Sequence, residues 1–248
     1  MKRLQKIFEN GKPLIAYITA GYPTLSKSEE SIKKMIDLGV RIFELGVPFS
    51  DPMADGDTIQ HAMRVAVKNN VDIQKTIELG AKIRQYNSEC ALLVMSYSNP
   101  VYKMGYSNFA ASLKDVGLDG AIIPDLPPDE GKKLYTEMKV KGLAAITFLT
   151  PLTSAIRVKR IASAACGFIY IISHPGITGS GFASSPALQK LLTTARKVTD
   201  VPLCVGFGIK TKKDIQKIEG KIDGYIVGSE IIKAIDENRL ESAVKALL

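Results

Sequence analysis

Short apolar runs recur along the chain and are separated by longer amphipathic stretches. Each run is continuously apolar, which is typical of strands that are covered on both faces. The eight runs are Leu14–Thr19, Arg41–Leu45, Ala91–Ser96, Gly120–Ile123, Ala144–Phe148, Phe168–Ile172, Pro202–Val205 and Tyr225–Val227. They predict eight β-strands.

Helical patterns fill the stretches between the predicted strands. They are Lys27–Leu38, Ile73–Tyr86, Asp129–Val140, Ser154–Ala164, Ala187–Val198 and Lys212–Glu219. Strands that alternate with helices pair in parallel, and eight such units in 248 residues match an α/β fold, the eight-stranded parallel (β/α) TIM barrel. An open doubly wound sheet is the alternative. No linker or change of composition divides the chain, so we expect residues 1–248 to form a single domain.

Two insertions depart from the regular alternation. The gap between the second and third predicted strands has room for an extra short helix near Asp57–Lys68. The segment from Ser173 to Ser185 is long and rich in glycine and serine, which is typical of a mobile lid over an active site.

Composition narrows the classes of function. The net charge of +8 favours anions, but no run of five basic residues with interleaved aromatics indicates nucleic acid. Cys90, Cys166 and Cys204 lie far apart in or beside apolar segments, so we expect buried reduced thiols and no metal site. The chain begins with basic residues but has no apolar signal core, and no segment is long enough to cross a membrane. We therefore expect a soluble, cytoplasmic protein.

The loop after the second predicted strand concentrates acidic residues. Glu44 lies at the end of an apolar strand, and Asp51 and Asp55 follow in a tight loop. A carboxylate at the mouth of an apolar strand is costly to desolvate, and acids with perturbed pKa values are typical of proton-transfer sites. The alternative is that Glu44 is a strand-end acid whose hydrogen bonds are satisfied.

Glycine-bearing turns after the last two strands predict a phosphate site. Gly206 to Ile209 follows the seventh strand, and Gly228-Ser229 follows the eighth and enters a helical segment. Glycines let backbone amides approach an anion, a helix start adds free donors, and Ser229 is expected to serve as both helix cap and ligand. The alternative is that these glycines only end strands and cap helices.

Taken together, these motifs resemble the family of tryptophan synthase α subunits over essentially the whole chain. The family signature of the acidic loop is met in full from Glu44 to Gly56. Further matches, in the expected order, are Tyr17-Ile18-Thr19-Ala20-Gly21, Ser98-Asn99-Pro100, Pro124-Asp125-Leu126-Pro127 and Gly176-Ile177-Thr178-Gly179.

The resemblance implies a retro-aldol cleavage of indole-3-glycerol phosphate to indole and glyceraldehyde 3-phosphate, without metal or organic cofactor. Glu44 matches the general acid-base, for which a raised pKa is useful. Asp55 matches the second catalytic acid, which accepts a hydrogen bond from the indole N1–H and remains ionised.

The resemblance also implies the remaining site and the partner. Tyr17, Tyr170 and Ile226 line the pocket, although apolar strand ends are equally often packed core. Thr178 closes the lid, and Gly179, Gly208, Gly228 and Ser229 bind phosphate. The loops with Pro48, Asp51, Asn99 and Asp125–Pro128 face a β subunit, which holds pyridoxal phosphate and receives indole through a tunnel. An α2β2 heterotetramer with substrate channelling follows.

Three positions depart from the family pattern. His174 replaces an arginine that is usual in the lid, Pro175 follows it, and Asp57 replaces a common proline. We hypothesise a stiffer and weakly pH-sensitive lid, against the alternative of a solvated loop histidine.

Two other functions remain open at the level of sequence. One is another phosphate-binding barrel enzyme, such as an isomerase or a lysine-dependent aldolase, but the lysines cluster on predicted helices. The other is a binding and activating subunit whose own chemistry has decayed, against which the intact Glu44 and Asp55 argue.

Overall fold

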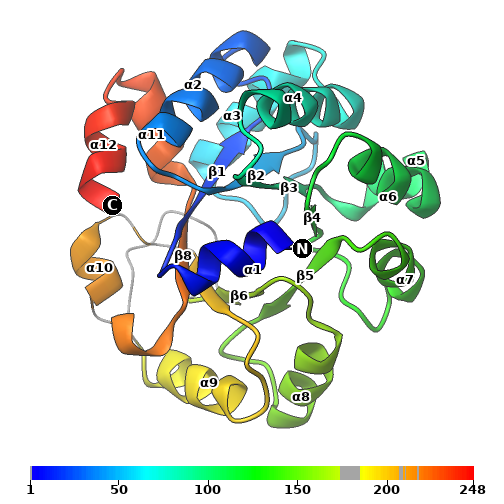
Figure 1. The fold of residues 1–248 in the computed structure, drawn as a ribbon, viewed down its shortest axis with the longest axis vertical. Coiled ribbons are helices and arrows are strands. Elements are labelled where there is room, and N and C mark those ends of the chain that lie inside the picture. The colour runs from blue at the N-terminus through cyan, green and yellow to red at the C-terminus, as the bar shows by residue number, and fades with distance from the viewer. Residues whose placement is uncertain (1, 174–184, 207–208, 210, 217) are drawn as a thin grey trace.

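The computed structural model describes residues 2–173, 185–206, 209, 211–216 and 218–248. Its centre is a closed barrel of parallel strands that pair in chain order, and β1 closes the ring by pairing with β8 (Figure 1). The strands are β1 (Leu14–Thr19), β2 (Ile42–Gly46), β3 (Ala91–Met95), β4 (Gly120–Ile122), β5 (Ala144–Leu149), β6 (Ile169–Ile172), β7 (Leu203–Gly206) and β8 (Gly224–Val227). The prediction of a TIM barrel is confirmed, and the open sheet is wrong because the ring leaves no edge strand.

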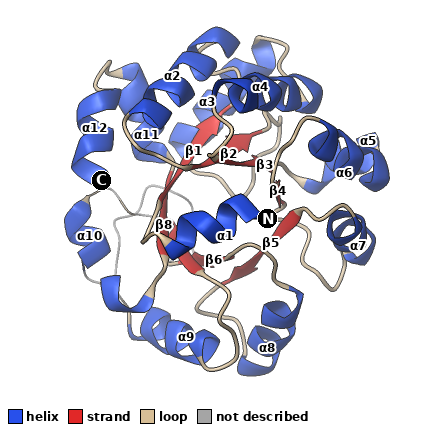
Figure 2. Cartoon of the chain, viewed as in Figure 1, coloured by secondary structure: helices blue, strands red, loops and turns tan. Residues whose placement is uncertain are grey.

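Except for the first helix, the helices surround the barrel on its outer face (Figure 2). They are α1 (Lys2–Glu9), α2 (Leu25–Asp37), α3 (Asp57–Lys68), α4 (Ile73–Tyr86), α5 (Ser98–Met104), α6 (Tyr106–Asp115), α7 (Lys132–Val140), α8 (Ala155–Ala164), α9 (Pro186–Arg196), α10 (Lys212–Gln216), α11 (Ser229–Asp236) and α12 (Leu240–Leu247), with a 3-10 turn at Glu219–Lys221. The extra helix predicted between the second and third strands is α3.

Some helices were not predicted or begin elsewhere than expected. Helix α5 was not predicted, and its Pro100 lies in the first turn, where proline is tolerated. Gly105, at φ 86°, then separates α5 from α6. Helix α7 begins three residues after the predicted start at Asp129, because the Pro127 carbonyl accepts hydrogen bonds from the amides of Glu130 and Gly131 and forms a turn there.

The strands pack on both faces, which explains their continuously apolar sequence. Along β1, Ile15 and Tyr17 belong to the cluster inside the barrel, whereas Ala16 and Ile18 belong to the cluster between the barrel and its helices. Alternate positions therefore face two different apolar layers. Because the interior is a packed core, a polar side chain that points into it is desolvated by the barrel itself.

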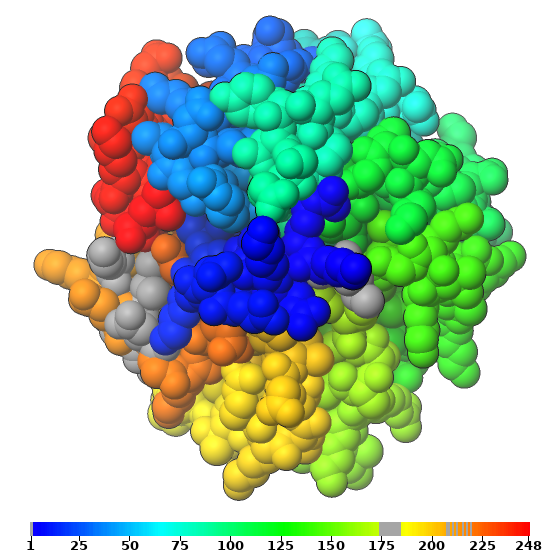
Figure 3. Space-filling view, viewed as in Figure 1, coloured from blue at the N-terminus to red at the C-terminus, as the bar shows by residue number. Residues whose placement is uncertain are grey.

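Helix α1 lies across one end of the barrel (Figure 3). Its Leu4 is buried and joins the interior cluster, and the ring of Phe8 packs against that of Phe168 with centroids 6.1 Å apart. Phe168 immediately precedes β6, so the covered end is the one at which the strands begin. The loops that follow the strands lie at the opposite end.

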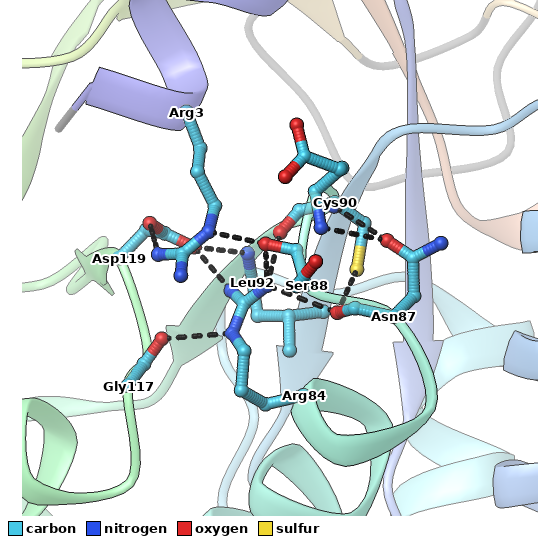
Figure 4. A network of polar contacts seen from close by, with 9 residues as sticks. Arg3, Arg84, Asn87, Ser88, Cys90, Leu92, Gly117 and Asp119 are labelled. Atoms are coloured by element: carbon cyan, nitrogen blue, oxygen red, sulfur yellow. Dashed lines mark hydrogen bonds and ion pairs between the residues drawn. The ribbon is translucent and has the colours of Figure 1, made fainter.

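An ionic network around the buried carboxylate of Asp119 ties α1 to the barrel (Figure 4). The carboxylate of Asp119 accepts hydrogen bonds from Arg3 at 3.0 Å, from Arg84 at 2.7 Å and from the amide of Leu92 at 2.9 Å. Arg84 also donates to the carbonyl oxygens of Asn87, Ser88, Cys90 and Gly117. The network joins three segments that are far apart in the sequence, namely α1, the stretch 84–92 and the stretch 117–119, at the end of the barrel away from the acidic loop.

Replacing Asp119 with alanine is expected to lower the free energy of unfolding by about 3 kcal/mol, because two guanidinium groups and a buried amide lose their acceptor. Urea unfolding at pH 7 measures the loss. Glu89→Ala is the matched control, since it removes an exposed pair with Lys6 that also links α1 to the barrel, and it should change little. Equal losses of unfolding free energy in the two variants would contradict the inference that burial strengthens the contacts of Asp119.

Candidate active site

Glu44 lies in β2 and is almost completely buried, with 1% of its surface exposed. In the strand register it stands between Tyr17 of β1 and Leu93 of β3. Its Oε1 atom has no hydrogen-bond partner among the described residues. Burial, and secondly the nearby charge of Asp55, raise the pKa of Glu44 from its ordinary 4.5 to about 8. A carboxyl group in this setting is protonated at pH 7 and has an oxygen available for a ligand.

Asp55 lies in the loop between β2 and α3 and is 2% exposed. The loop folds back on itself, because the amide of Asp55 donates to the Pro52 carbonyl, and Gln60 of α3 donates to the Asp55 carbonyl at 2.7 Å. Burial raises the pKa of Asp55 from 3.8 to about 6, while a hydrogen bond from Tyr97 lowers it. Asp55 is therefore mostly ionised at pH 7, in contrast to Glu44.

Tyr97 is the site residue that sequence reasoning missed. It lies two residues after the end of β3, and its phenol donates to Oδ2 of Asp55 at 2.7 Å while accepting from the amide of Ala54 at 2.9 Å. Its ring stacks on Phe49 with centroids 5.1 Å apart. The available signal was its place at the carboxyl end of a barrel strand, where side chains reach the active site.

Two tyrosines predicted to line the pocket lie inside the barrel: Tyr17 pairs with Glu44 in the strand register, and Tyr170 lies in β6. Tyr17 and Tyr170 are both buried, and burial together with the charges of Glu44 and Asp55 raises the pKa of each phenol well above 10. The hydroxyls therefore stay protonated. The ring of Tyr170 stacks on Phe148, with centroids 5.0 Å apart. These rings supply an apolar wall beside the two carboxyl groups.

Ile226 of β8 also faces the interior of the barrel. It is 3% exposed and belongs to the same packed cluster as Tyr17. Burial is common to core and pocket side chains, so the role of Ile226 as a pocket residue stays a prediction.

Each tyrosine lies over a glycine of a neighbouring strand. A Cβ added at Gly46 would stand 2.6 Å from Cζ of Tyr17, and one added at Gly206 would stand 2.6 Å from Cζ of Tyr170. Real Cβ atoms do not approach other atoms so closely. The two glycines thus leave the space in which the phenol rings lie.

Replacing Gly46 with alanine is expected to lower the free energy of unfolding by about 2 kcal/mol and to reduce kcat/KM, because the Tyr17 ring must leave its place. Urea unfolding and steady-state kinetics measure the two effects. Gly220→Ala serves as the control, since an added Cβ would meet nothing within 4 Å there. Unchanged kinetics in Gly46→Ala would show that the place of the Tyr17 ring does not matter for turnover.

The predicted phosphate turn after β8 has a different cap from the one expected. The prediction that Ser229 caps the helix is wrong: Gly228 is the N-cap of α11, and Ser229 is the first helical residue. The backbone already turns at Gly228, where a Cβ would come within 3.3 Å of the Tyr17 ring. Gly228 has no side chain with which to cap the first amides of α11, and amides at a helix start are donors of the kind that bind anions.

Several predicted residues cannot be placed. Thr178, Gly179 and Gly208, and the lid departures His174 and Pro175, lie outside the described residues. Asp57, the third departure from the family pattern, is the first residue of α3. There its negative charge interacts favourably with the positive end of the helix dipole.

The loops expected to face a partner lie at the same end of the barrel as Asp55. Asp51, Asn99 and Asp125 are exposed there, whereas Pro48 is buried. Met53 of the acidic loop is 81% exposed, which is unusual for an apolar side chain. This end of the barrel therefore offers both polar and apolar contacts.

Among the described residues, no group of three or more His, Cys, Asp and Glu side chains is arranged to hold a metal ion. Within the same residues, no helix is long and apolar enough to cross a membrane.

Comparison with known proteins identifies the relatives of the chain. The family model described as "Tryptophan synthase alpha chain" matches residues 4–247. The tryptophan synthase alpha chain of Petrotoga mobilis is 40% identical over 96% of this chain and 92% of the relative. A structure of Mycobacterium tuberculosis tryptophan synthase has a TM-score of 0.92 at 32% identity, covering 99% of this chain and 96% of that one. A structure of the tryptophan synthase a2b2 complex of Pyrococcus furiosus has a TM-score of 0.88 at 30% identity, covering 96% and 98%.

Proposed function

The chain belongs to the tryptophan synthase alpha chain family, and we propose that Glu44 and Asp55 are the two carboxyl groups with which it carries out the family reaction. The protein is a lyase that cleaves indole-3-glycerol phosphate to indole and glyceraldehyde 3-phosphate in tryptophan biosynthesis. The family needs no cofactor of its own, and pyridoxal phosphate resides in the β subunit.

The cleavage needs two proton transfers and a place for positive charge. Protonated Glu44 gives its proton to C3 of the indole ring, and the ring becomes a cation with a tetrahedral C3. The C3′ hydroxyl then loses its proton to the Glu44 carboxylate, the C3–C3′ bond breaks, and its electron pair returns to the ring. Indole and the aldehyde leave, and Glu44 is protonated again. Asp55 accepts a hydrogen bond from N1–H and stabilises the ring cation.

The opposite protonation states of the two carboxyl groups are the observation that carries the proposal. A general acid must be protonated and a charge-stabilising group must be ionised, and both conditions hold between the pKa of Asp55, about 6, and that of Glu44, about 8. Tyr97 supports this difference, because its phenol stabilises the ionised form of Asp55 alone.

The remaining roles follow the family. We assign Tyr17, Tyr170 and Ile226 to the pocket around the indole and glycerol parts. Gly228 and Ser229, at the start of α11, bind the phosphate together with Gly179 and Gly208, and Thr178 closes the lid on the Asp55 loop. Tyr17 and Tyr170 lie close enough to Glu44 and Asp55 for these charges to raise the pKa of both phenols, which supports their assignment to the pocket. The glycine N-cap of α11 supports the phosphate site.

A β subunit is the proposed partner, in an α2β2 heterotetramer that passes indole through a tunnel. The Pyrococcus furiosus relative is described as an a2b2 complex. The exposed Asp51, Asn99 and Asp125, the segment 125–128 and the exposed Met53 surround the mouth of the site, where a partner would receive the product. Pro48 is buried and contributes to this surface only through its neighbours. A single domain over residues 1–248 and a cytoplasmic location complete the proposal.

Indole release from indole-3-glycerol phosphate tests the function, measured from pH 5 to 9 with and without a cognate β subunit. We expect release that the partner stimulates and that is bell-shaped with pH, falling below about 6 and above about 8. A chain that stimulates β chemistry but releases no indole even in the complex would instead be a binding subunit. Trapping of a substrate adduct by borohydride would point to a lysine-dependent aldolase.

A further inference from the structure

The loop after β4 approaches the residue that follows Tyr97. Asp125 accepts two hydrogen bonds from Ser98, one from the backbone amide at 2.8 Å and one from the hydroxyl at 2.7 Å. Ser98 begins α5, and its N-cap is Tyr97, whose side chain makes no capping bond. A carboxylate from another loop therefore satisfies a donor that the helix leaves free, in a favourable position relative to the helix dipole.

Apart from the bonds of its phenol, Tyr97 is held by three contacts with groups that have no part in the reaction. Its ring stacks on Phe49, its carbonyl accepts from the Ser96 hydroxyl at 2.9 Å, and the residue after it is tied to Asp125. Its phenol then points to a single carboxylate oxygen of Asp55. A hydrogen bond between a phenol and a carboxylate is short and directional, so a small shift of the 97–98 backbone weakens it.

We infer that Asp125 is a positioning residue for Asp55, which it places through Ser98 and Tyr97. The inference rests on the proposed role of Asp55. It adds to that role a link between the catalytic carboxylate and an exposed carboxylate on the loop that we assign to the partner surface. A partner that draws Asp125 away from Ser98 would thereby change the hydrogen bond on Asp55.

The direction in which the pKa of Asp55 shifts distinguishes a positioning role of Asp125 from a direct effect of its charge. Asp55 is faced by Tyr97 from the N-cap of α5, by Glu44 from β2, and by Tyr17 and Tyr170 from β1 and β6. Loss of the Tyr97 hydrogen bond raises the pKa of Asp55, because that bond stabilises the ionised form. Removal of the negative charge of Asp125 alone would lower the same pKa, because like charges disfavour ionisation.

The experiment follows the Asp55 carboxyl group in the full chain without substrate. Carbon-13 NMR of labelled aspartate, assigned with Asp55→Asn, gives its pKa in the wild type, Ser98→Ala and Asp125→Ala. We expect the pKa of Asp55 to rise in both variants. We also expect kcat at pH 7 to fall about tenfold with KM nearly unchanged, a loss of the size that misplaced catalytic groups produce.

Two further variants keep the test decisive. Asp129→Ala removes a carboxylate of the same loop that pairs with Arg157 and Arg160, and it should leave the pKa of Asp55 and kcat unchanged. Ser98→Thr keeps the hydroxyl and should behave as the wild type. An unchanged or lowered pKa of Asp55 in both Ser98→Ala and Asp125→Ala would overturn the inference. The proposed role of Asp55, on which the inference rests, fails on a different result, namely full activity of Asp55→Asn.

Discussion

Glu44→Gln is expected to lower kcat for indole release by about a thousandfold, within the range for loss of a general acid-base. The amide cannot give a proton to indole C3 or take one from the C3′ hydroxyl, while its size stays nearly the same. Steady-state release in the presence of a β subunit measures the effect. The matched control is Glu78→Gln on the outside of α4, which should retain full activity. A loss of less than tenfold would exclude Glu44 as the proton donor.

The same substitution is expected to change how stability depends on pH. A carboxyl group whose pKa is higher in the folded protein binds its proton more tightly there, so folding is favoured below pH 4.5 and this contribution is lost as the pH rises to about 8. The difference between these two pKa values corresponds to about 5 kcal/mol. Urea unfolding from pH 5 to 9 should therefore show a steep fall in wild-type stability and a much flatter one in Glu44→Gln. Parallel curves would mean that Glu44 is not desolvated.

Asp55→Asn is expected to lower kcat by about a hundredfold or more, because the amide can still accept a hydrogen bond from N1–H but has no charge to stabilise the ring cation. Asp55→Ala should lose both contributions and fall further. The comparison of the two variants thus separates charge from hydrogen bonding, and it uses the same indole assay. Equal rates in Asp55→Asn and the wild type would remove Asp55 from the mechanism.

The pH profile of Asp55→Asn adds an independent readout. The limb near pH 6 should disappear because the group that titrates there is gone. The limb near pH 8 should move to lower pH, since the charge of Asp55 helps to raise the pKa of Glu44. An unchanged upper limb would show that the two carboxyl groups do not interact.

Burial of the Glu44 carboxyl group thus has opposite effects on stability and on activity. An acid buried without a hydrogen-bond partner on Oε1 among the described residues destabilises the ionised protein. The same burial makes Glu44 a proton donor near neutral pH. Helix α1 and the Asp119 network lie at the opposite end of the barrel, where their contacts stabilise the fold without entering the site.

Much of the site could be predicted because its signals are local. Glu44 and Asp55 are separated by one loop, and the strand that ends near Glu44 is a continuous apolar run. Tyr97 was missed because its partner lies 42 residues away in the sequence, and nothing in a tyrosine after a strand says which carboxylate it meets. The same holds for Ser98 and Asp125, which are 27 residues apart.

The sequence by itself determined the barrel, the approximate strands, the helix α3 and the two carboxyl groups, because apolar periodicity and a contiguous motif are properties of neighbouring residues. Only the tertiary structure decided which residue caps α11, which end of the barrel α1 covers, and that Tyr97 opposes the effect of burial on Asp55. The pKa values near 8 and 6 arise from desolvation and from contacts between distant strands. Desolvation and these contacts depend on how the strands close into a barrel, so the pattern of residues along the chain does not reveal them.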